Sequence, residues 1–371
     1  MHFMVRFFSF MGETHTTTAA RTRGRDFYRA LPKVELHRHL EGSLRLVTML
    51  EIAQQYALDV PLHDPPALRQ LVQVLPGEPY TYQNFLSKFL TLRKFYRSPE
   101  IIQRVTREAI YDAAADNVRY LELRFTPVAL GILGNFPLSE VITWVVEAAR
   151  AAEARCGVKT RLIASINRHE SIELAEQVTR LAIDRKDDGI VGLDLAGDEA
   201  NFSARPFASL FGEARQAGLR LTVHAGEWGG AANVAEAIEV LHAERIGHGV
   251  RVFEDERAVA VARAHGAIFE VCPTSNIQSG VCPSLETHPL GRMLDSGLIS
   301  TLNTDDPGVS AIKLTHEYEN ACETIGLTLA DLRRMTVDAA SHAFLNHGEN
   351  AALAAQIGAE FDLAVENSRT P

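Results

Sequence analysis

Eight short runs of apolar and β-branched residues recur along the chain, and amphipathic stretches separate them. The runs occupy residues 34–40, 118–126, 160–166, 190–196, 219–224, 245–250, 267–272 and 299–303. Buried strands that alternate with helices are typical of βα units, in which consecutive strands pair in parallel. Eight such units close into a barrel, so we predict an α/β protein with the (β/α)8 TIM-barrel fold.

The length of the chain bounds the number of domains. Its 371 residues, 46% of them apolar, can bury one large core, and barrels of this size are often single domains. We therefore predict one domain over residues 30–371. Residues 1–29 combine a short apolar stretch with a Thr- and Arg-rich segment that lacks periodicity. Because no cleavage site of the signal-peptide type follows, we predict a disordered leader there.

A long insertion, residues 42–117, separates the first two predicted strands and is rich in Leu, Phe and Tyr. We expect it to form helices over the mouth of the barrel. Most of its aromatic residues should pack against the barrel, because apolar residues at helical spacing usually belong to the core. One or two of them should line a pocket.

Charge and composition exclude several classes of partner. The formal charge is −10 and no stretch is dense in Lys and Arg, which argues against nucleic acid because such binding neutralises phosphates. No run reaches the roughly 20 apolar residues that a membrane span needs. The four cysteines form no CxxC pair, which indicates reduced thiols and a cytoplasmic protein. A small, uncharged or cationic substrate fits this chain best.

Imidazole and carboxylate side chains occur where the predicted strands end. They are His37, His39, His224, Glu227, His248, Asp305 and Asp306. In a (β/α)8 barrel the C-terminal ends of the strands carry the chemistry, whereas residues that serve only stability would be expected elsewhere. We therefore expect these side chains to share one site.

His37 and His39 lie two residues apart in a predicted strand, so their side chains project from the same face. Such a pair is a weak signal alone. With a third imidazole and a carboxylate it completes a shell typical of catalytic zinc, which keeps one position open for water. Adjacent carboxylates such as Asp305 and Asp306 point to opposite sides of a strand, so we expect a turn at residues 307–308 to bring both to the mouth.

Five motifs in this order resemble those of adenosine deaminases in the amidohydrolase superfamily, and the resemblance extends from Leu31 to Leu345. The motifs are LPKVELHRHLEG (31–42), DLAGDE (194–199), HAGE (224–227), GHG (247–249) and LNTDDP (302–307). The resemblance implies that one Zn²⁺ is bound by His37, His39, His224 and Asp305. It further implies that Glu227 and His248 are catalytic, and that a purine nucleoside substrate contacts His39, Glu41, Gly197 and Asp306.

The chemistry of the residues supports these roles. Deamination of an aminopurine adds water to an electron-poor ring carbon and expels ammonia, and zinc can lower the pKa of water to about 7. Glu227 could then donate a proton to the neighbouring ring nitrogen, provided that burial keeps its carboxyl group protonated. His248 could hold the water and stabilise the developing charge.

The choice of substrate within the family rests on a few positions. Glu41 stands where adenosine enzymes most often carry Asp, and enzymes that act on adenine or on modified adenine nucleosides commonly carry Glu there. The motifs at 194–199 and 274–278 are more similar to the nucleoside enzymes. We therefore rank adenosine and 2′-deoxyadenosine first, ahead of adenine and aminodeoxyfutalosine-type substrates.

Other readings fit the sequence less well. Zinc deaminases that act on flipped bases need a P-C-x-x-C motif, which the chain lacks. The fourth predicted strand has no lysine to bridge two metal ions, so one metal is expected. A non-catalytic nucleoside-binding or growth-factor-like module would be marked by loss of a ligand, and every expected ligand is present.

Overall fold

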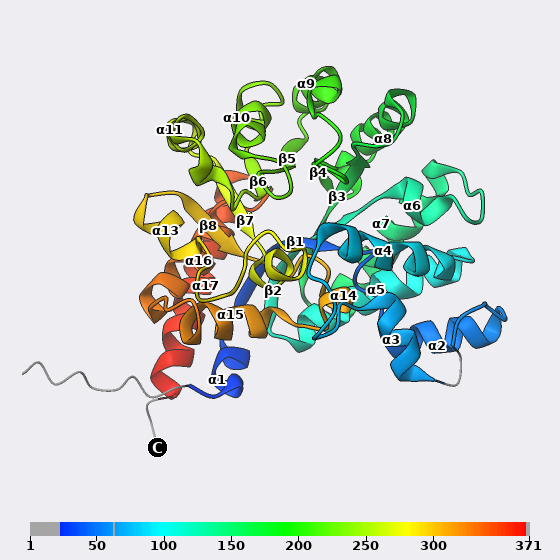
Figure 1. The fold of residues 1–371 in the computed structure, drawn as a ribbon, viewed down its shortest axis with the longest axis horizontal. Coiled ribbons are helices and arrows are strands. Elements are labelled where there is room, and N and C mark those ends of the chain that lie inside the picture. The colour runs from blue at the N-terminus through cyan, green and yellow to red at the C-terminus, as the bar shows by residue number, and fades with distance from the viewer. Residues whose placement is uncertain (1–22, 62–63, 369–371) are drawn as a thin grey trace, which may run out of the picture.

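Eight parallel strands form one sheet in the order β1 to β8, and the helices surround it (Figure 1). This computed structural model describes residues 23–61 and 64–368. Each predicted run overlaps one strand, so the (β/α)8 prediction is confirmed. The strands are β1 (Lys33–His39), β2 (Val118–Phe125), β3 (Lys159–Asn167), β4 (Ile190–Ala196), β5 (Arg220–Ala225), β6 (Arg245–His248), β7 (Ile268–Val271) and β8 (Ile299–Leu302).

The sheet closes where β8 meets β1. The backbone N–H of His39 donates to the carbonyl of Asp305 (2.8 Å), and the N–H of Asp305 donates to the carbonyl of His37 (3.0 Å). Asn303 extends this seam, because its Oδ1 accepts the backbone N–H groups of Leu36 (2.8 Å) and His37 (3.1 Å). The side-chain amide of Asn303, the residue after β8, thus takes the place of a strand carbonyl at this seam.

Most of the helices follow the strands around the outside of the barrel. The α-helices are α1 (Arg25–Ala30), α2 (Leu46–Gln55), α3 (Pro65–Val72), α4 (Tyr82–Leu92), α5 (Pro99–Ala115), α6 (Pro127–Gly131), α7 (Leu138–Cys156), α8 (Ile172–Asp184), α9 (Ala208–Gln216), α10 (Ala231–Glu239), α11 (Glu256–His265), α12 (Pro273–Gln278), α13 (Leu290–Asp295), α14 (Pro307–Ser310), α15 (Leu314–Glu323), α16 (Leu329–Ser341) and α17 (His347–Asn367). Short 3₁₀ turns are η1 (Arg93–Phe95), η2 (Lys186–Asp188), η3 (Arg205–Phe207) and η4 (Val252–Glu254).

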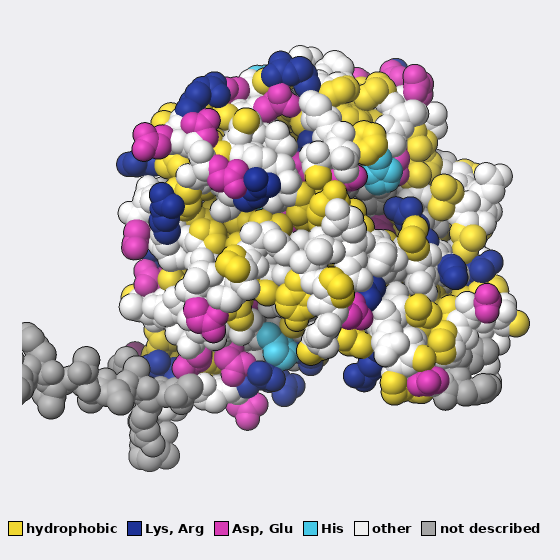
Figure 2. Space-filling model, in the orientation of Figure 1, with side chains coloured by type: hydrophobic (Ala, Val, Ile, Leu, Met, Phe, Trp, Pro, Cys, Tyr) yellow, Lys and Arg dark blue, Asp and Glu magenta, His cyan; other side chains and the backbone are white. Residues whose placement is uncertain are grey.

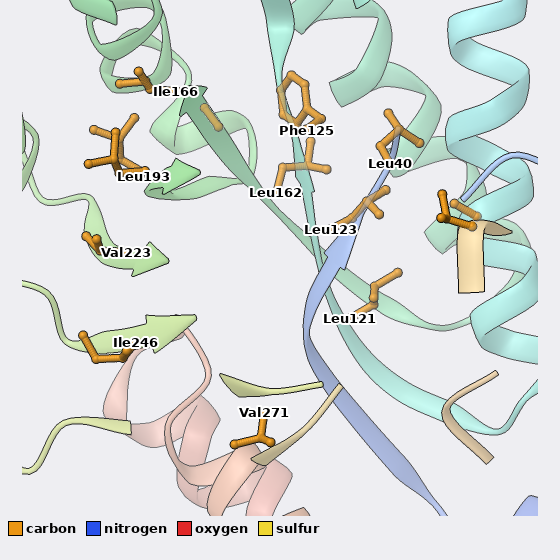
Figure 3. Packing of buried hydrophobic residues seen from close by; sticks show 14 of the residues in the cluster. Leu40, Leu121, Leu123, Phe125, Leu162, Ile166, Leu193, Val223, Ile246 and Val271 are labelled. Atoms are coloured by element: carbon orange, nitrogen blue, oxygen red, sulfur yellow. The ribbon is translucent and has the colours of Figure 1, made fainter. Parts of the chain in front are cut away.

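The two faces of the barrel strands differ in polarity. Figure 3 shows Leu121, Leu123 and Phe125 on one face of β2, and these apolar side chains pack in the main core beneath the helices. Since side chains alternate along a strand, Arg124 points to the interior of the barrel, where it pairs with Glu270 of β7 (2.7 Å). The floor beneath the mouth is therefore a buried network of charges rather than a layer of apolar residues.

The insertion between β1 and β2 is helical. Its helix α4 places Phe85 in the core and carries Tyr82, whose ring stacks on Trp228 after β5 (centroids 5.4 Å apart). This contact ties the insertion to the far side of the barrel mouth. As predicted, most of the aromatic side chains of the insertion pack in or against the core, and two of them, Phe85 and Phe89, line the pocket described below.

Residues 1–22 of the predicted leader lie outside the described residues. Its last residues instead form helix α1, in which Tyr28 is fully buried and its hydroxyl bonds to Glu323 of α15. Within residues 23–61 and 64–368, no helix has both the length and the apolar character needed to cross a membrane. On the face shown in Figure 2, Lys and Arg side chains are scattered among Asp and Glu without a continuous basic stripe.

Candidate active site

A cavity of about 250 Å³ opens at the C-terminal ends of the strands. Its wall combines apolar side chains of α4 with polar side chains from the barrel, and its size suits a small ligand. Eight of the nine predicted site residues line it: His39, Glu41, Gly197, His224, Glu227, His248, Asp305 and Asp306. The ninth, His37, is fully buried and contacts Asp305. The structure thus brings together every residue that the sequence predicts.

Three imidazoles and one carboxylate converge at the base of the cavity. Asp305 Oδ1 lies 3.1 Å from Nε2 of His37 and 3.4 Å from Nε2 of His39. The Nε2 atoms of His39 and His224 are 3.2 Å apart. One ligand atom each from His37, His224, His248 and Asp305 also fits within 4.8 Å, so His248 stands beside the predicted ligand set.

Carboxylates outside this group orient two of the imidazoles. Nδ1 of His37 lies 2.9 Å from Oε2 of Glu270, and Nδ1 of His224 lies 3.0 Å from Oδ1 of Asp194. Each carboxylate accepts the Nδ1 hydrogen, so the Nε2 lone pair faces the centre of the site, as is usual for histidines that bind metals. The hydroxyl of Ser275 donates to the other oxygen of Asp305 (2.7 Å).

The electrostatics of this group favour a bound cation. Burial and Arg124 act to lower the pKa of His37, but the carboxylates of Asp305 and Glu270 outweigh them and raise it. Burial lowers the pKa of His39 well below its usual value, so this imidazole is neutral and can act as a ligand. Nitrogen and carboxylate donors in this arrangement suit a divalent metal such as zinc.

Two of the central residues have left-handed backbone conformations. His248 has a φ of 61° and Asp305 has a φ of 63°, which few residues other than glycine adopt. This conformation ends β6 and turns the chain after β8, so both side chains reach the cavity. Asp305 itself makes the turn that we expected at residues 307–308. Gly247 leaves room for these rings, because a Cβ there would lie 3.1 Å from His37 and 3.2 Å from His224.

Glu227 is held by a buried carboxylate on the neighbouring loop. Glu199 accepts the backbone N–H groups of Gly226 (2.7 Å), Glu227 (2.9 Å) and Trp228 (2.8 Å). Oε2 of Glu227 lies 3.6 Å from Nε2 of His248. Burial raises the pKa of Glu227 well above its usual range, and nearby carboxylates raise it further. The direction of this shift favours the protonated acid over the carboxylate.

Glycines shape the rest of the cavity floor. Gly197 lines the cavity with a φ of 87°, and a Cβ there would lie 3.1 Å from His169. A Cβ on Gly42 would overlap the carboxylate of Asp306 at 1.8 Å. Oδ1 of Asp306 is buried and has no hydrogen-bond partner among the described residues. It therefore offers an open bonding position to a ligand.

Further unpaired atoms lie toward the mouth. Oε1 of Glu41 accepts the backbone N–H of Thr126 (2.6 Å), whereas its Oε2 is buried and without a partner in the described part of the chain. The same holds for Nε of Arg93 and Nε1 of Trp228, which also line the cavity. Burial raises the pKa of Glu41 to about 7, and the positive charge of Arg93 opposes this rise. A ligand with hydroxyl groups could satisfy these atoms.

Sequence reasoning missed the residues that orient the site. Glu270, Asp194, Glu199 and Ser275 contact the predicted ligands or hold the Glu227 loop. Asp194, Glu199 and Ser275 lie within motifs that the sequence analysis quotes, but none of the four was given a role. One signal was present for the first two, since each is a charged residue inside an otherwise apolar strand run. The apolar wall from α4 was expected only as one or two aromatic residues of the insertion, and Arg93 carried no signal.

Comparisons with known proteins agree with this geometry. A sequence model of the adenosine deaminase family matches residues 32–360. The adenosine deaminase of Erwinia tasmaniensis is 40% identical over 331 residues, which cover 89% of this chain and 98% of that protein.

Two solved structures share the fold over nearly their whole length. An amidohydrolase from Burkhoderia ambifaria with bound zinc has a TM-score of 0.85 at 28% identity and covers 96% of this chain and 98% of that chain. An adenine deaminase from Arthrobacter aurescens has a TM-score of 0.79 at 28% identity, covering 92% and 100%.

Proposed function

Because the chain belongs to the adenosine deaminase family of hydrolases acting on C–N bonds, we propose that it deaminates adenosine and 2′-deoxyadenosine with zinc. The products are inosine or 2′-deoxyinosine and ammonia. The observation that carries the proposal is the convergence of Asp305 with three histidines beside Glu227, a buried acid with a raised pKa.

We assign His37, His39, His224 and Asp305 as the ligands of one zinc ion per chain. The Burkhoderia protein with bound zinc supports the choice of metal. The ion would supply an activated water at neutral pH. The carboxylates of Glu270 and Asp194 would keep the Nε2 atoms of two ligands free for the metal, and Arg124 would hold Glu270 in place (2.7 Å).

Glu227 and His248 act on the substrate. The carboxyl group of Glu227 donates its proton to the ring nitrogen beside the attacked carbon, and this makes that carbon more electrophilic. His248 stabilises the oxygen that adds to the ring. Asp306 and the backbone of Gly197 orient the purine, because both residues line the cavity and Oδ1 of Asp306 has no partner among the described residues.

The mouth of the cavity supports a nucleoside rather than a free base. Oε2 of Glu41 is a buried acceptor and Nε of Arg93 a buried donor, and neither has a partner within residues 23–61 and 64–368. A sugar hydroxyl can donate to the first and accept from the second, whereas an anion would face the carboxylate of Glu41. His39, at the same side of the cavity, also contacts the substrate in this proposal.

A second candidate is adenine deamination. The Arthrobacter neighbour is an adenine deaminase, and Glu41 is the residue that departs from the adenosine pattern. In that case Glu41 would close the space that a ribose occupies.

For the cellular location we propose the cytoplasm, because the four cysteines are free thiols and none of them pairs in the described structure.

The deciding experiment measures ammonia release by the zinc-loaded protein from adenosine, 2′-deoxyadenosine, adenine, AMP, N6-substituted adenosine and an aminodeoxyfutalosine-type nucleoside. The proposal expects the highest kcat/KM for adenosine and 2′-deoxyadenosine. A preference for adenine would transfer the assignment to the second candidate. Binding of adenosine without release of ammonia would indicate the non-catalytic module.

A further inference from the structure

Three hydrogen bonds connect His248 to a backbone N–H at the start of α13. The N–H of Leu290 donates to Nδ1 of His288 (3.2 Å). Nε2 of His288 lies 3.2 Å from Oδ1 of Asn276, and Nδ2 of Asn276 lies 3.1 Å from Nδ1 of His248. Asn276 and His248 are essentially inaccessible, and His288 is 6% exposed.

The direction of every bond in this chain follows from its first donor. A backbone N–H can only donate, so Nδ1 of His288 must present a lone pair. Burial lowers the pKa of His288 to about 4, so the ring is neutral and its single N–H hydrogen sits on Nε2. That hydrogen must be donated to a carbonyl oxygen, which places Oδ1 of Asn276 toward His288. The NH₂ group of Asn276 then faces His248.

The amide of Asn276 therefore determines which nitrogen of His248 carries hydrogen. A donor faces Nδ1, so Nδ1 is an acceptor and carries no hydrogen. We propose that His288 and Asn276 are positioning residues that hold His248 in the tautomer with hydrogen on Nε2. If the amide of Asn276 were turned around, its NH₂ group would face the Nε2–H of His288, and two donors would oppose each other.

This inference rests on the proposed function and makes the role of His248 specific. Nε2 faces the catalytic centre, 3.6 Å from Oε2 of Glu227. With a hydrogen there, His248 donates a hydrogen bond to the oxygen that adds to the purine, and it neither binds the metal nor accepts a proton at Nε2. The tautomer also explains why His39, and not His248, completes the ligand set although both lie close to it.

The backbone around Asn276 is held by hydrogen bonds that do not involve its side chain. Helix α12 is held separately, because Oε1 of Glu317 accepts the backbone N–H of Thr274 (2.8 Å). The backbone carbonyl of Asn276 accepts the N–H groups of Val281 and Cys282 (3.0 and 2.9 Å), and a new side chain leaves these bonds in place.

The test combines a spectroscopic readout with kinetics on the zinc-loaded protein. Long-range ¹H–¹⁵N NMR of histidine-labelled protein reports which ring nitrogen carries hydrogen, and the His248 signal is identified by its loss in His248→Ala. We expect hydrogen on Nε2 in the wild type. Asn276→Asp offers only acceptors, so the hydrogen should move to Nδ1, and an imidazole in the wrong tautomer can lower kcat by up to about 10⁴-fold.

His288→Gln and His288→Leu form the matched pair. Glutamine can still donate to Asn276 and should keep both the tautomer and a rate near that of the wild type, whereas leucine should lose both. Hydrogen on Nδ1 in the wild type, or an unchanged kcat in Asn276→Asp after the tautomer has moved, would overturn the inference. If the zinc-loaded wild type deaminates no aminopurine, the proposed function fails, and the NMR result still decides the tautomer.

Discussion

Replacement of Glu199 by Gln tests how the loop that carries Glu227 is held. Two backbone N–H groups donate to one oxygen of Glu199, and one backbone N–H and the amide of Asn233 (2.9 Å) donate to the other. The side chain is buried, with the residue 4% exposed. Glutamine has the same shape but only one accepting oxygen, so two of these four hydrogen bonds are lost whichever way its amide turns.

The structure sets the scale of the effect. A hydrogen bond to a charged acceptor contributes about 1.5–3 kcal/mol, so the loss of two costs at most about 3–6 kcal/mol. The loop can avoid part of this cost by moving, and Glu227 then moves with it. A displacement of about 1 Å can lower an enzyme rate about 10²-fold, and we expect a fall in kcat of this order.

The charge of Glu199 adds a second effect, on the pH profile. Burial raises the pKa of Glu227 most, and the carboxylates of Asp305 and Glu199 raise it further. A proton donor is active below its pKa and loses activity as the pH rises through it. Removal of the negative charge at position 199 lowers the pKa of Glu227, so the alkaline limb of kcat should move to lower pH.

The assay is kcat against pH for zinc-loaded wild type, Glu199→Gln and a control, Glu236→Gln. Glu236 pairs with Arg205 at the surface (2.7 Å), so its replacement should change neither quantity. An unchanged kcat together with an unchanged alkaline limb in Glu199→Gln, at full zinc content, would refute this account of the loop.

Four further predictions follow from the site. Glu227→Gln should retain zinc by metal analysis and lose about 10² to 10⁴ in kcat; near-normal turnover would contradict its role as a proton donor. His224→Ala should lower both zinc content and activity, and chelation followed by added zinc should abolish and restore turnover of the wild type; two tightly bound ions per chain would exclude the assigned site. Glu41→Ala should lower kcat/KM for adenosine by about 10- to 150-fold, from the 1.5–3 kcal/mol of a charged hydrogen bond, and leave adenine a poor substrate; equal effects on both would separate Glu41 from the sugar. Arg245→Met leaves Glu270 without one of its buried partners (2.6 Å), so it should lower the free energy of unfolding, measured in urea, by about 3–5 kcal/mol. A change smaller than the error of the measurement would contradict this.

The order of strands and the positions of the ligands follow from local sequence patterns. A strand is recognised from a few consecutive residues, and a parallel barrel brings all C-terminal strand ends to one face. For this reason His37, His39, His224 and Asp305 could be grouped before their distances were known. The strand ends were less accurate. The run 245–250 continues past the end of β6 because the left-handed backbone of His248 stops the strand, and no apolar pattern reports a positive φ.

The exact side-chain positions in the site could not be predicted from the sequence, because they depend on contacts between residues far apart in the chain. Glu270, which orients His37, lies 233 residues from it, and Glu122, which pairs with Arg245, lies 123 residues from that arginine. Arg93 reaches the cavity only because the insertion folds back over the mouth. Their effects depend on distances of about 3 Å between groups that are brought together by packing.

The sequence by itself therefore determined the α/β barrel, the face that carries the chemistry and the residue types gathered there, since periodicity and strand ends are local properties. Only the tertiary structure decided which nitrogen of each histidine faces the centre, how Glu199 holds Glu227, and how His288 and Asn276 orient His248. Hydrogen-bond direction and burial arise between elements that meet only in the folded chain, and these two properties set the protonation states on which the proposed chemistry depends.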